Sequence, residues 1–269
     1  MSTIGWILGI RWQNHLVKKF LEANGIEYNV GRIKLPSYCE SVRIDVGLSV
    51  NAPQSAVWIS RDPTVHVFGF EPVQENRKSI QRGNSPWPIN LDPKNIGTRI
   101  NIIPCALLEE HIPAGLDIYV TKKDPGCSSI LKPKTFEVDY VENVPVFSLN
   151  DFLEDFPFEV VEYISHLKID VQGADIQVLE GARKFLNEIM CITVEVDTHE
   201  YESTRNSLDS IQQVLEPFGF VLLKKGLIAK IMTLLKGIRV NAEADDPTFL
   251  NLPLYKAKKP DKFWVYQRG

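Results

Sequence analysis

The residues best suited to chemistry lie in the segment Leu167-Lys168-Ile169-Asp170-Val171, where a predicted β-strand runs into a helix through Gln172-Gly173. Lys168 and Asp170 alternate there with apolar side chains. A charge inside an otherwise apolar strand is costly unless it is paired or used. Asp170 is therefore a candidate general base and ligand contact, and Lys168 is a candidate catalytic residue beside it. Pairing of the two charges, or capping of the next helix by Asp170, is the purely structural alternative.

A second group of polar residues follows the first predicted strand, in the turn that begins Asp45-Val46-Gly47. A glycine at this point lets the backbone come close to a bound ligand. Ser49 and Asn51, which follow it, can donate or accept hydrogen bonds, and Asp45 can bind an amine. An ordinary turn between a strand and a helix would explain the same residues.

The second predicted strand ends in Phe70-Glu71-Pro72. An acidic residue at this position can accept hydrogen bonds from both hydroxyls of a ribose, and its spacing from Gly47 favours that role. A surface glutamate before a turn proline is the alternative. Ala106 follows the third strand and belongs to the same expected rim of the sheet.

A dinucleotide site is disfavoured by the glycine pattern. It needs G-x-G-x-x-G, whose glycines and helix N-terminus hold a pyrophosphate. Here only Gly47 is present, and Ser49 and Ala52 occupy the later positions. The phosphate-loop signature G-x-x-x-x-G-K-[ST] is absent as well. A nicotinamide-dependent oxidoreductase is therefore the weaker alternative.

Further candidate bases follow the fifth predicted strand, which ends at the same rim. Glu195 and His199 are both close to that strand end, although helix capping or a solvated loop would also account for them. Asp170, Glu195 and Asp197 together offer oxygen atoms that suit magnesium. They do not form a dense carboxylate cluster in the sequence, so no metal is predicted.

Apolar runs separated by helical patterns predict the elements that carry these residues. The predicted strands are Val42–Val46, Val65–Phe70, Ile100–Pro104, Ile164–Val171, Ile192–Val196, Phe220–Leu223 and Phe263–Tyr266. The predicted helices cover about 12–24, begin at Gln54, run over Ala174–Glu188, and extend from an N-cap at Ser203 to Leu215. This alternation predicts an α/β fold with a mostly parallel sheet and helices on both faces. Ligands bind beyond the carboxyl ends of such strands.

Length and composition are those of an ordinary globular protein. The chain has 269 residues, 44% of them hydrophobic, and a net charge of −4. A mildly acidic chain is a poor nonspecific binder of nucleic acid. No apolar run reaches the length of a membrane span, and the four cysteines form no CxxC pair. We expect a cytoplasmic protein with reduced thiols that binds neither nucleic acid nor membrane.

The chain divides into an N-terminal helical extension, residues 1–40, and a body, residues 41–269. Between the third and fourth strands lies an insertion, about 107–161, which carries Lys122, Lys123, Cys127 and Ser128. The stretch 224–259 has an apolar helical face and is a possible lid. We expect these two segments to recognise the substrate, with the turn 245–248 and Asn251 as further lining of its pocket.

These motifs together resemble the FkbM family of class I methyltransferases. The family pattern shows D-V-G, F-E-P and L-K-I-D-V-E-G-A-E…L-x-G-A, which correspond to Asp45–Gly47, Phe70–Pro72 and Leu167–Ala182. Two shorter stretches, 125–130 and 146–153, match its G-x-S-S-L and V-x-T-L-D-D-F-L segments. The similarity covers about Val42 to Val196. The chain departs from the pattern at Gln172 and Asp175, which replace glutamates, and it lacks the second glycine of the first loop.

The resemblance implies a Rossmann-like class I methyltransferase with a seven-stranded sheet. Its cofactor would be S-adenosylmethionine, and its acceptor a hydroxyl of a sugar, a glycan or a small-molecule metabolite. The residues expected to bind cofactor are Asp45, Gly47, Ser49, Asn51, Glu71, Pro72, Ala106 and Asp170. The residues expected to act in catalysis are Lys168, Asp170, Glu195 and His199. A catalytically silent binding protein with the same fold is a third hypothesis, because the first loop and Gln172 depart from the family pattern.

Overall fold

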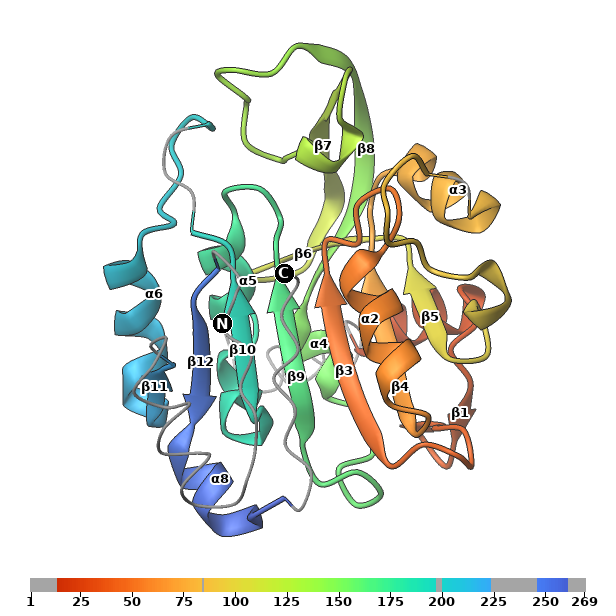
Figure 1. The fold of residues 1–269 in the computed structure, drawn as a ribbon, viewed down its shortest axis with the longest axis vertical. Helices are drawn as coiled ribbons and strands as arrows, with labels where there is room; N and C mark the ends of the chain where they lie inside the picture. Colours follow the sequence, from red (N-terminus) through yellow and green to blue (C-terminus); the bar gives the residue numbers. More distant parts are fainter. Residues whose placement is uncertain (1–13, 84, 197–199, 224–245, 261–269) are drawn as a thin grey trace, which may run out of the picture.

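The structure is a computed structural model that describes residues 14–83, 85–196, 200–223 and 246–260. Its centre is a seven-stranded sheet in the order β11-β12-β10-β9-β3-β4-β5 (Figure 1). The strands are β3 (Ser41–Val46), β4 (Val65–Phe70), β5 (Ile100–Ile103), β9 (Ile164–Ile169), β10 (Cys191–Val194), β11 (Phe220–Leu222) and β12 (Thr248–Asn251).

Five of these strands run parallel in the order β5-β4-β3-β9-β10. Numbered along the chain, this is 3-2-1-4-5, the order of the Rossmann fold. The order reverses between β3 and β9, where Val46 lies opposite Ile169. Both strands therefore end at the same level, and the crevice between their carboxyl ends is where a ligand is expected. The mostly parallel α/β sheet predicted from the sequence is confirmed.

The seventh strand differs from the prediction. The predicted strand Phe263–Tyr266 lies outside the described residues. The described seventh strand is β12, which pairs antiparallel with β10 and with β11. It includes Asn251, which was expected to line the ligand site but is buried and caps the next helix through Leu254 N–H at 3.1 Å. The part of the predicted lid that the structure describes therefore contains a strand of the central sheet rather than a mobile cover.

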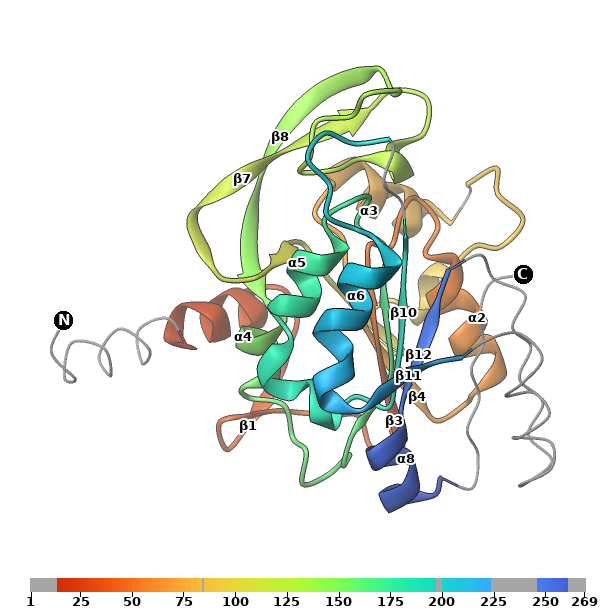
Figure 2. The same ribbon diagram turned by 90° about the vertical axis from the view of Figure 1, so that its left-hand side faces the viewer.

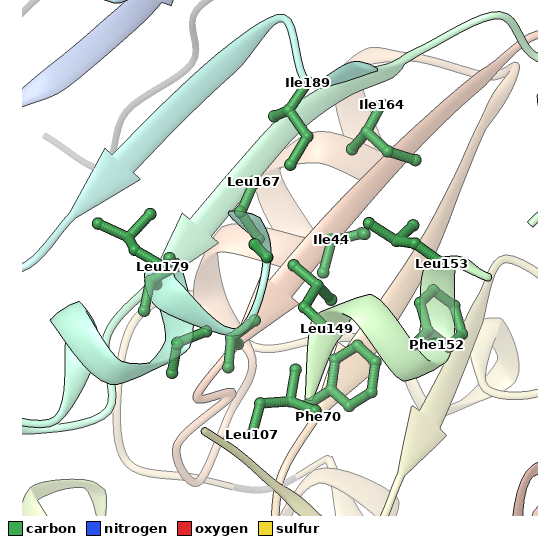
Figure 3. Packing of buried hydrophobic residues seen from close by; sticks show 14 of the residues in the cluster. Ile44, Phe70, Leu107, Leu149, Phe152, Leu153, Ile164, Leu167, Leu179 and Ile189 are labelled. Atoms are coloured by element: carbon green, nitrogen blue, oxygen red, sulfur yellow. The ribbon is translucent and has the colours of Figure 1, made fainter. Parts of the chain in front are cut away.

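Helices cover both faces of the sheet (Figure 2). Among the described residues, these helices include α2 (Pro53–Arg61), α3 (Gln74–Arg82), α4 (Leu149–Leu153), α5 (Asp175–Glu180), α6 (Leu208–Leu215) and α8 (Leu252–Lys258). On the face of α2, Trp58 packs against Val65 and Val67 of β4. The opposite face is the larger core, in which α4, α5 and α6 pack on β3 and β9. Figure 3 shows its centre, with Leu149 and Phe152 of α4 beside Ile44 and Leu167.

The N-terminal segment packs on this core. Residues 14–23 are helical, within the range predicted for a helix. The helical Val17 and Leu21 are buried in the main core cluster. A short hairpin follows, formed by β1 (Tyr28–Asn29) and β2 (Arg32–Ile33), and its Ile33 joins the same cluster. Residues 14–33 therefore cover one side of the main body.

The insertion folds into a small sheet of its own, in the order β6-β8-β7. Its elements are β6 (Ala106–Leu108), β7 (Ile112–Thr121) and β8 (Val138–Ser148), and α4 follows directly. In Figure 1 the β7–β8 hairpin rises beyond the carboxyl ends of β3 and β9. The connection between its strands contains the short helix η2 (Pro125–Cys127). Within the part of the chain that the structure describes, no helix has both the length and the apolar character to cross a membrane.

Two predicted helices have different limits in the structure. The helix expected over Ala174–Glu188 ends at Gly181 and continues as the 3₁₀ helix η3 (Arg183–Glu188). Gly181 lies against the backbone of Leu108, and its carbonyl accepts the N–H of Asn150 at 2.6 Å, so tertiary contacts interrupt the helix. The second helix begins at Leu208 because Ser207, not Ser203, caps it by accepting the N–H of Ser210. The remaining 3₁₀ helices are η1 (Pro93–Asn95) and η4 (Glu216–Phe218).

Replacing Gly181 by alanine should destabilise the fold through steric overlap. The added Cβ would collide with the carbonyl of Leu108, while the backbone of Gly181, with φ −69°, needs no glycine. We expect the free energy of unfolding in urea to fall by about 2–3 kcal/mol. The control is Gly97→Ala, where the Cβ meets no atom but φ is +75°, and we expect a loss of about 1 kcal/mol. A smaller loss for Gly181→Ala than for Gly97→Ala would contradict this account.

Candidate active site

A cavity of about 320 Å³ opens at the carboxyl ends of β3, β4 and β9, at the point where the strand order reverses. The following predicted site residues line it: Gly47, Ser49, Asn51, Glu71, Pro72, Ala106, Lys168, Asp170 and Glu195. His199 lies outside the described residues. Residues that are distant in the sequence thus come together where the Rossmann topology places a ligand.

Gly47 forms the floor of the cavity between two neighbouring strands. Its φ is +84°, and a Cβ on it would overlap the carbonyl oxygen of Asp170. Its N–H donates to the carbonyl of Phe70 at 3.0 Å, and the N–H of Asp170 donates to the carbonyl of Val46 at 3.0 Å. Only glycine fits this position, because the left-handed backbone and the close approach both exclude a side chain.

Asp45 is the predicted cofactor ligand that the structure places elsewhere. Its side chain is buried and does not belong to the cavity lining. One carboxylate oxygen accepts the N–H of Ser55 at 3.1 Å and its hydroxyl at 2.6 Å, and the other lies 3.6 Å from Nζ of Lys168. Asp45 therefore fixes the first turn of α2 and helps to hold Lys168. A contact between Asp45 and an amine of the ligand, direct or through water, stays a prediction.

Glu71 is nearly enclosed but still borders the cavity. Its Oε1 accepts the N–H of Val73 at 2.9 Å and Nδ2 of Asn76 at 3.2 Å, and its Oε2 accepts the N–H of Ser49 at 2.9 Å. Burial raises the pKa of Glu71 to about 7, and these hydrogen bonds offset only part of the effect. The carboxylate is thus held in one position relative to the glycine turn.

The hydrogen bonds around Glu71 leave acceptor capacity for a ligand. An ionised carboxylate has about four lone-pair positions, and three are used by Val73, Asn76 and Ser49. The buried Oδ1 of Asn76, a residue that lines the same cavity, has no hydrogen-bond partner. A ligand with two neighbouring hydroxyl donors, such as a ribose, fits this pair of acceptors. Asn76 was missed by the sequence reasoning, although it follows Glu71 by little more than one helical turn.

Lys168 connects the two halves of the site. Its Nζ donates to the carbonyl of Gly47 at 2.8 Å and lies 3.1 Å from Oδ2 of Asp170 and 3.6 Å from Oδ1 of Asp45. Burial lowers the pKa of Lys168, but the carboxylates of Asp170 and Asp45 raise it by more, so the ammonium stays charged. A fully engaged ammonium acts electrostatically on Asp170 and does not serve as a proton donor or nucleophile.

Asp170 and Glu195 form a carboxyl pair joined by the side-chain amide of Gln172. Nε2 of Gln172 donates to Oδ1 of Asp170 and to Oε2 of Glu195, both at 2.8 Å. Burial raises the pKa of Asp170, but the charge of Lys168 and the hydrogen bonds from Gln172 and Glu195 lower it by more. Burial and the Asp170 charge raise the pKa of Glu195 to about 10. Of the two carboxyl groups, Glu195 is therefore the harder to ionise.

Asp175 has a structural role that the sequence did not reveal. Its buried carboxylate accepts the N–H groups of Val171 at 3.0 Å and Gly173 at 3.1 Å, and it also accepts from Nδ2 of Asn206. Burial and the Asp170 charge raise its pKa to about 7. These bonds fix the loop that carries Gln172, whose φ of +59° is unusual for a residue other than glycine.

The connection at 124–130, in the insertion, forms a wall of the cavity. It is tied to both halves of the site: Nδ2 of Asn76 donates to the carbonyl of Pro125 at 3.2 Å, and Oγ of Ser129 donates to the carbonyl of Gln172 at 2.7 Å. Cys127 and Ser128, predicted to recognise the acceptor, line the cavity. Lys122 does not line it and pairs with Glu137 at 2.9 Å on the surface, and Lys123 does not line it either.

No group of three or more His, Cys, Asp or Glu side chains suited to a metal occurs in the described part of the chain. The hypothetical magnesium ligand Asp197 lies outside that part. At the position beside Asp170 and Glu195, Gln172 presents N–H donors to the carboxylates. Among the described residues, the positive charge beside Asp170 is the ammonium of Lys168, and the amide of Gln172 donates to both carboxyl groups.

The parallel order 3-2-1-4-5 and the cavity at its switch point define a Rossmann-like α/β fold, and comparison with known proteins supplies the family. Residues 45–222 match the family model described as the methyltransferase FkbM domain. The chain belongs to this family, is a methyltransferase, and has the Rossmann-like fold that the sequence predicted.

Similarity to individual proteins is distant. A solved "antibiotic related Methyltransferase" is 13% identical, with 84% of this chain and 95% of that chain covered and a TM-score of 0.32. A 16S rRNA (adenine(1408)-N(1))-methyltransferase from Catenulisporales acidiphilia is 11% identical, with 87% and 90% covered and a TM-score of 0.34. A search of curated proteins found no match. None of these similarities bears on the acceptor.

The raised pKa of Glu71 predicts how this residue alters stability with pH. The folded protein keeps a proton on Glu71 up to about pH 7, whereas the unfolded chain releases it near the ordinary value of 4.5. The contribution of Glu71 to the free energy of unfolding is therefore complete below pH 4.5 and is lost as the pH rises through about 7. Relative to Glu71→Gln, which cannot titrate, wild type should lose about 3 kcal/mol of unfolding free energy across this range.

Urea unfolding of both proteins between about pH 5 and about pH 8 measures this difference. The variant Gly97→Ala changes no ionisable group and is the control, for which the difference from wild type should stay constant. A pH-independent difference between wild type and Glu71→Gln would contradict the raised pKa.

Proposed function

We propose that the chain is an S-adenosylmethionine-dependent O-methyltransferase that acts on a hydroxyl of a sugar, a glycan or another small-molecule metabolite. One observation carries the proposal. A single cavity holds both the buried acceptors Glu71 and Asn76, which suit a ribose, and the carboxylate Asp170, which a buried lysine keeps ionised. The first group fits a nucleoside cofactor, and the second fits removal of a proton from an acceptor.

The chain's own residues suit the proposed cofactor. Glu71 and Asn76 would accept from the ribose hydroxyls, and Gly47 would let the backbone approach the ligand. Pro72 and Ala106 give the cavity apolar surface of the kind on which an adenine ring packs. Asp170 and Ser49 border the same space.

The start of α2 favours this cofactor over a dinucleotide. In dinucleotide-binding folds the free N–H groups of this helix hold the pyrophosphate. Here Asp45 already accepts the N–H of Ser55 in the first turn, and the N-cap position is Ala52. The N–H of Ser55 is therefore already used inside the protein, so the nicotinamide alternative is disfavoured by an occupied donor as well as by the missing glycines.

Asp170 is the residue proposed to take the proton of the acceptor hydroxyl. S-adenosylmethionine supplies a methyl group that its sulfonium charge has already activated, so the protein needs to align the acceptor oxygen and receive its proton. Lys168 favours the ionised form of Asp170, whereas burial and the Asp170 charge make Glu195 harder to ionise, so Asp170 is the better base of the two. The wall at 124–130 would limit the access of water.

The surroundings of the cavity support a hydroxyl acceptor that does not depend on an anionic group. Neither Lys122 nor Lys123 lines the cavity, and Lys168 is fully engaged by Asp45, Asp170 and Gly47. Glu195 and Asp246 border the acceptor side of the cavity. As far as the described lining residues go, neutral polyols such as sugars fit these surroundings better than phosphorylated compounds do.

Isothermal titration calorimetry with S-adenosylhomocysteine, with NAD as the control ligand, tests the cofactor. We expect micromolar binding of S-adenosylhomocysteine and none of NAD. The variant Glu71→Ala should weaken the affinity by about 1.5–3 kcal/mol through lost hydrogen bonds to the ribose. Unchanged affinity in a folded Glu71→Ala protein would remove Glu71 from the site. Binding of neither ligand by the wild type would favour a silent binding protein.

Turnover of two variants separates the roles of the carboxyl pair. Asp170→Asn removes the proposed base and should lower methyl transfer by about 100-fold or more. Glu195→Gln should keep most of the activity, because an amide replaces a protonated carboxyl with similar hydrogen-bonding groups. The assay follows labelled methyl groups from S-adenosylmethionine into a panel of sugars, glycans and hydroxylated metabolites. Loss of activity in Glu195→Gln with retention in Asp170→Asn would reverse the assignment.

A further inference from the structure

We propose that Tyr201 is a positioning residue, which orients the side-chain amide of Gln172 and through it the Asp170–Glu195 pair. The inference deepens the proposed function, since it rests on Asp170 as the base of that reaction. Tyr201 would not touch the acceptor or the cofactor. It does not belong to the cavity lining, and only 1% of its surface is exposed.

Tyr201 lies in the segment that follows β10, and its phenol contacts the loop that carries Gln172 and Gly173. Its hydroxyl donates to Oε1 of Gln172 at 2.7 Å and lies 2.8 Å from the carbonyl oxygen of Cys127. Its ring lies over the backbone of Gly173, where an added Cβ would stand 3.2 Å from Cδ2 of the ring. The aromatic ring thus has a packing role, and the hydroxyl has a separate role that can be removed by itself.

The amide of Gln172 is held from both ends. At one end its two N–H bonds point to Asp170 and Glu195, each at 2.8 Å. At the other end its oxygen accepts from Tyr201. The reverse orientation would place the amide oxygen against two carboxyl oxygens and its N–H groups against the phenol. Charged neighbours and the Tyr201 donor therefore select the same orientation.

Loss of the Tyr201 hydroxyl should loosen this amide. Without a donor at its oxygen, the Gln172 side chain loses one of the three hydrogen bonds that fix it. Chains of hydrogen bonds polarise one another, so the two bonds to the carboxyl groups weaken as well. A carboxylate that loses an N–H donor is less stable as an anion, which makes both carboxyl groups harder to ionise.

Within the described part of the chain, the other ionisable groups that interact with the pair are Lys168, Asp45, Asp175, Asp246 and the thiol of Cys127. Tyr201→Phe replaces none of them. Lys168 contacts Asp170 from the same strand, and Asp175 faces the pair from α5. A change confined to the Tyr201 hydroxyl therefore reports on the amide and not on a new charge.

The test uses Tyr201→Phe, which keeps the ring and removes the hydroxyl. Nuclear magnetic resonance of protein labelled with ¹⁵N-glutamine follows the exchange of the Gln172 side-chain N–H groups with water at neutral pH. We expect exchange to quicken by about tenfold, the size expected for one lost hydrogen bond in a charged network. The matched control is Tyr38→Phe, which removes a phenol that donates to the carbonyl of Thr98 far from the cavity, and it should leave this exchange unchanged.

A second measurement asks whether the effect reaches the carboxyl groups through Gln172. The ¹³C signal of the Glu195 carboxyl should titrate near pH 10 in wild type and at a higher pH in Tyr201→Phe. In the background of Gln172→Met, which has no amide, Tyr201→Phe should add no further shift. An equal shift in both backgrounds, or unchanged exchange of the Gln172 amide, would overturn the proposal.

Cofactor binding separates this proposal from the proposed function. Tyr201→Phe should bind S-adenosylhomocysteine with the affinity of wild type, because the variant leaves Glu71 and Asn76 untouched. Weaker binding by Tyr201→Phe alone would overturn a role confined to the carboxyl pair. If wild type does not bind S-adenosylhomocysteine, the proposed function fails, while the amide and carboxyl measurements still decide what Tyr201 does.

Discussion

The buried ammonium of Lys168 is the interaction on which the site depends. A charge in this position would cost several kcal/mol if it were alone. It is stabilised by Asp45 on β3, by Asp170 at the end of β9 and by the carbonyl of Gly47. The same contacts fix the glycine turn, keep Asp170 ionised and connect to the first turn of α2 through Asp45 and Ser55. Framework and chemistry therefore share one ion network, and removal of Lys168 would leave Asp45 and Asp170 without the cation that pairs with both.

The insertion adds to this network a wall that contacts both halves of the cavity. On the cofactor side, Asn76 donates to Glu71 and to the carbonyl of Pro125. On the acceptor side, Ser129 and Tyr201 connect the wall to Gln172. Glu71 and Gln172 are thus held by side chains that also hold the same loop. Preorganisation of this kind suits a reaction in which the protein mainly aligns two ligands and receives a proton.

The sequence predicted the fold and most of the cavity lining because both follow from local patterns. Apolar β-branched runs mark buried parallel strands, and the switch-point rule places the residues after them, such as Gly47, Glu71 and Asp170, at one rim. It failed where a tertiary contact decides. Ser55 holds the carboxylate of Asp45, Gly181 interrupts a helix because β6 lies against it, and β12 is only four residues long, with polar Thr248 and Asn251 at its ends. Tyr201 contacts Gln172 across a separation in sequence that no motif describes.

Gln172 stands where the family pattern has a glutamate, and this difference removes one negative charge from the motif. Three carboxyl groups within hydrogen-bonding distance could ionise together only with further positive charge, because each anion raises the pKa of the next. An amide at this position contributes two donors and no charge, so Lys168 has one carboxylate fewer to balance. Lys168 distinguishes the two carboxyl groups, because its Nζ lies 3.1 Å from Asp170, whereas the amide donates to both at 2.8 Å. A base placed in this way is ready before the acceptor binds, which is what a reaction with an already activated methyl donor requires.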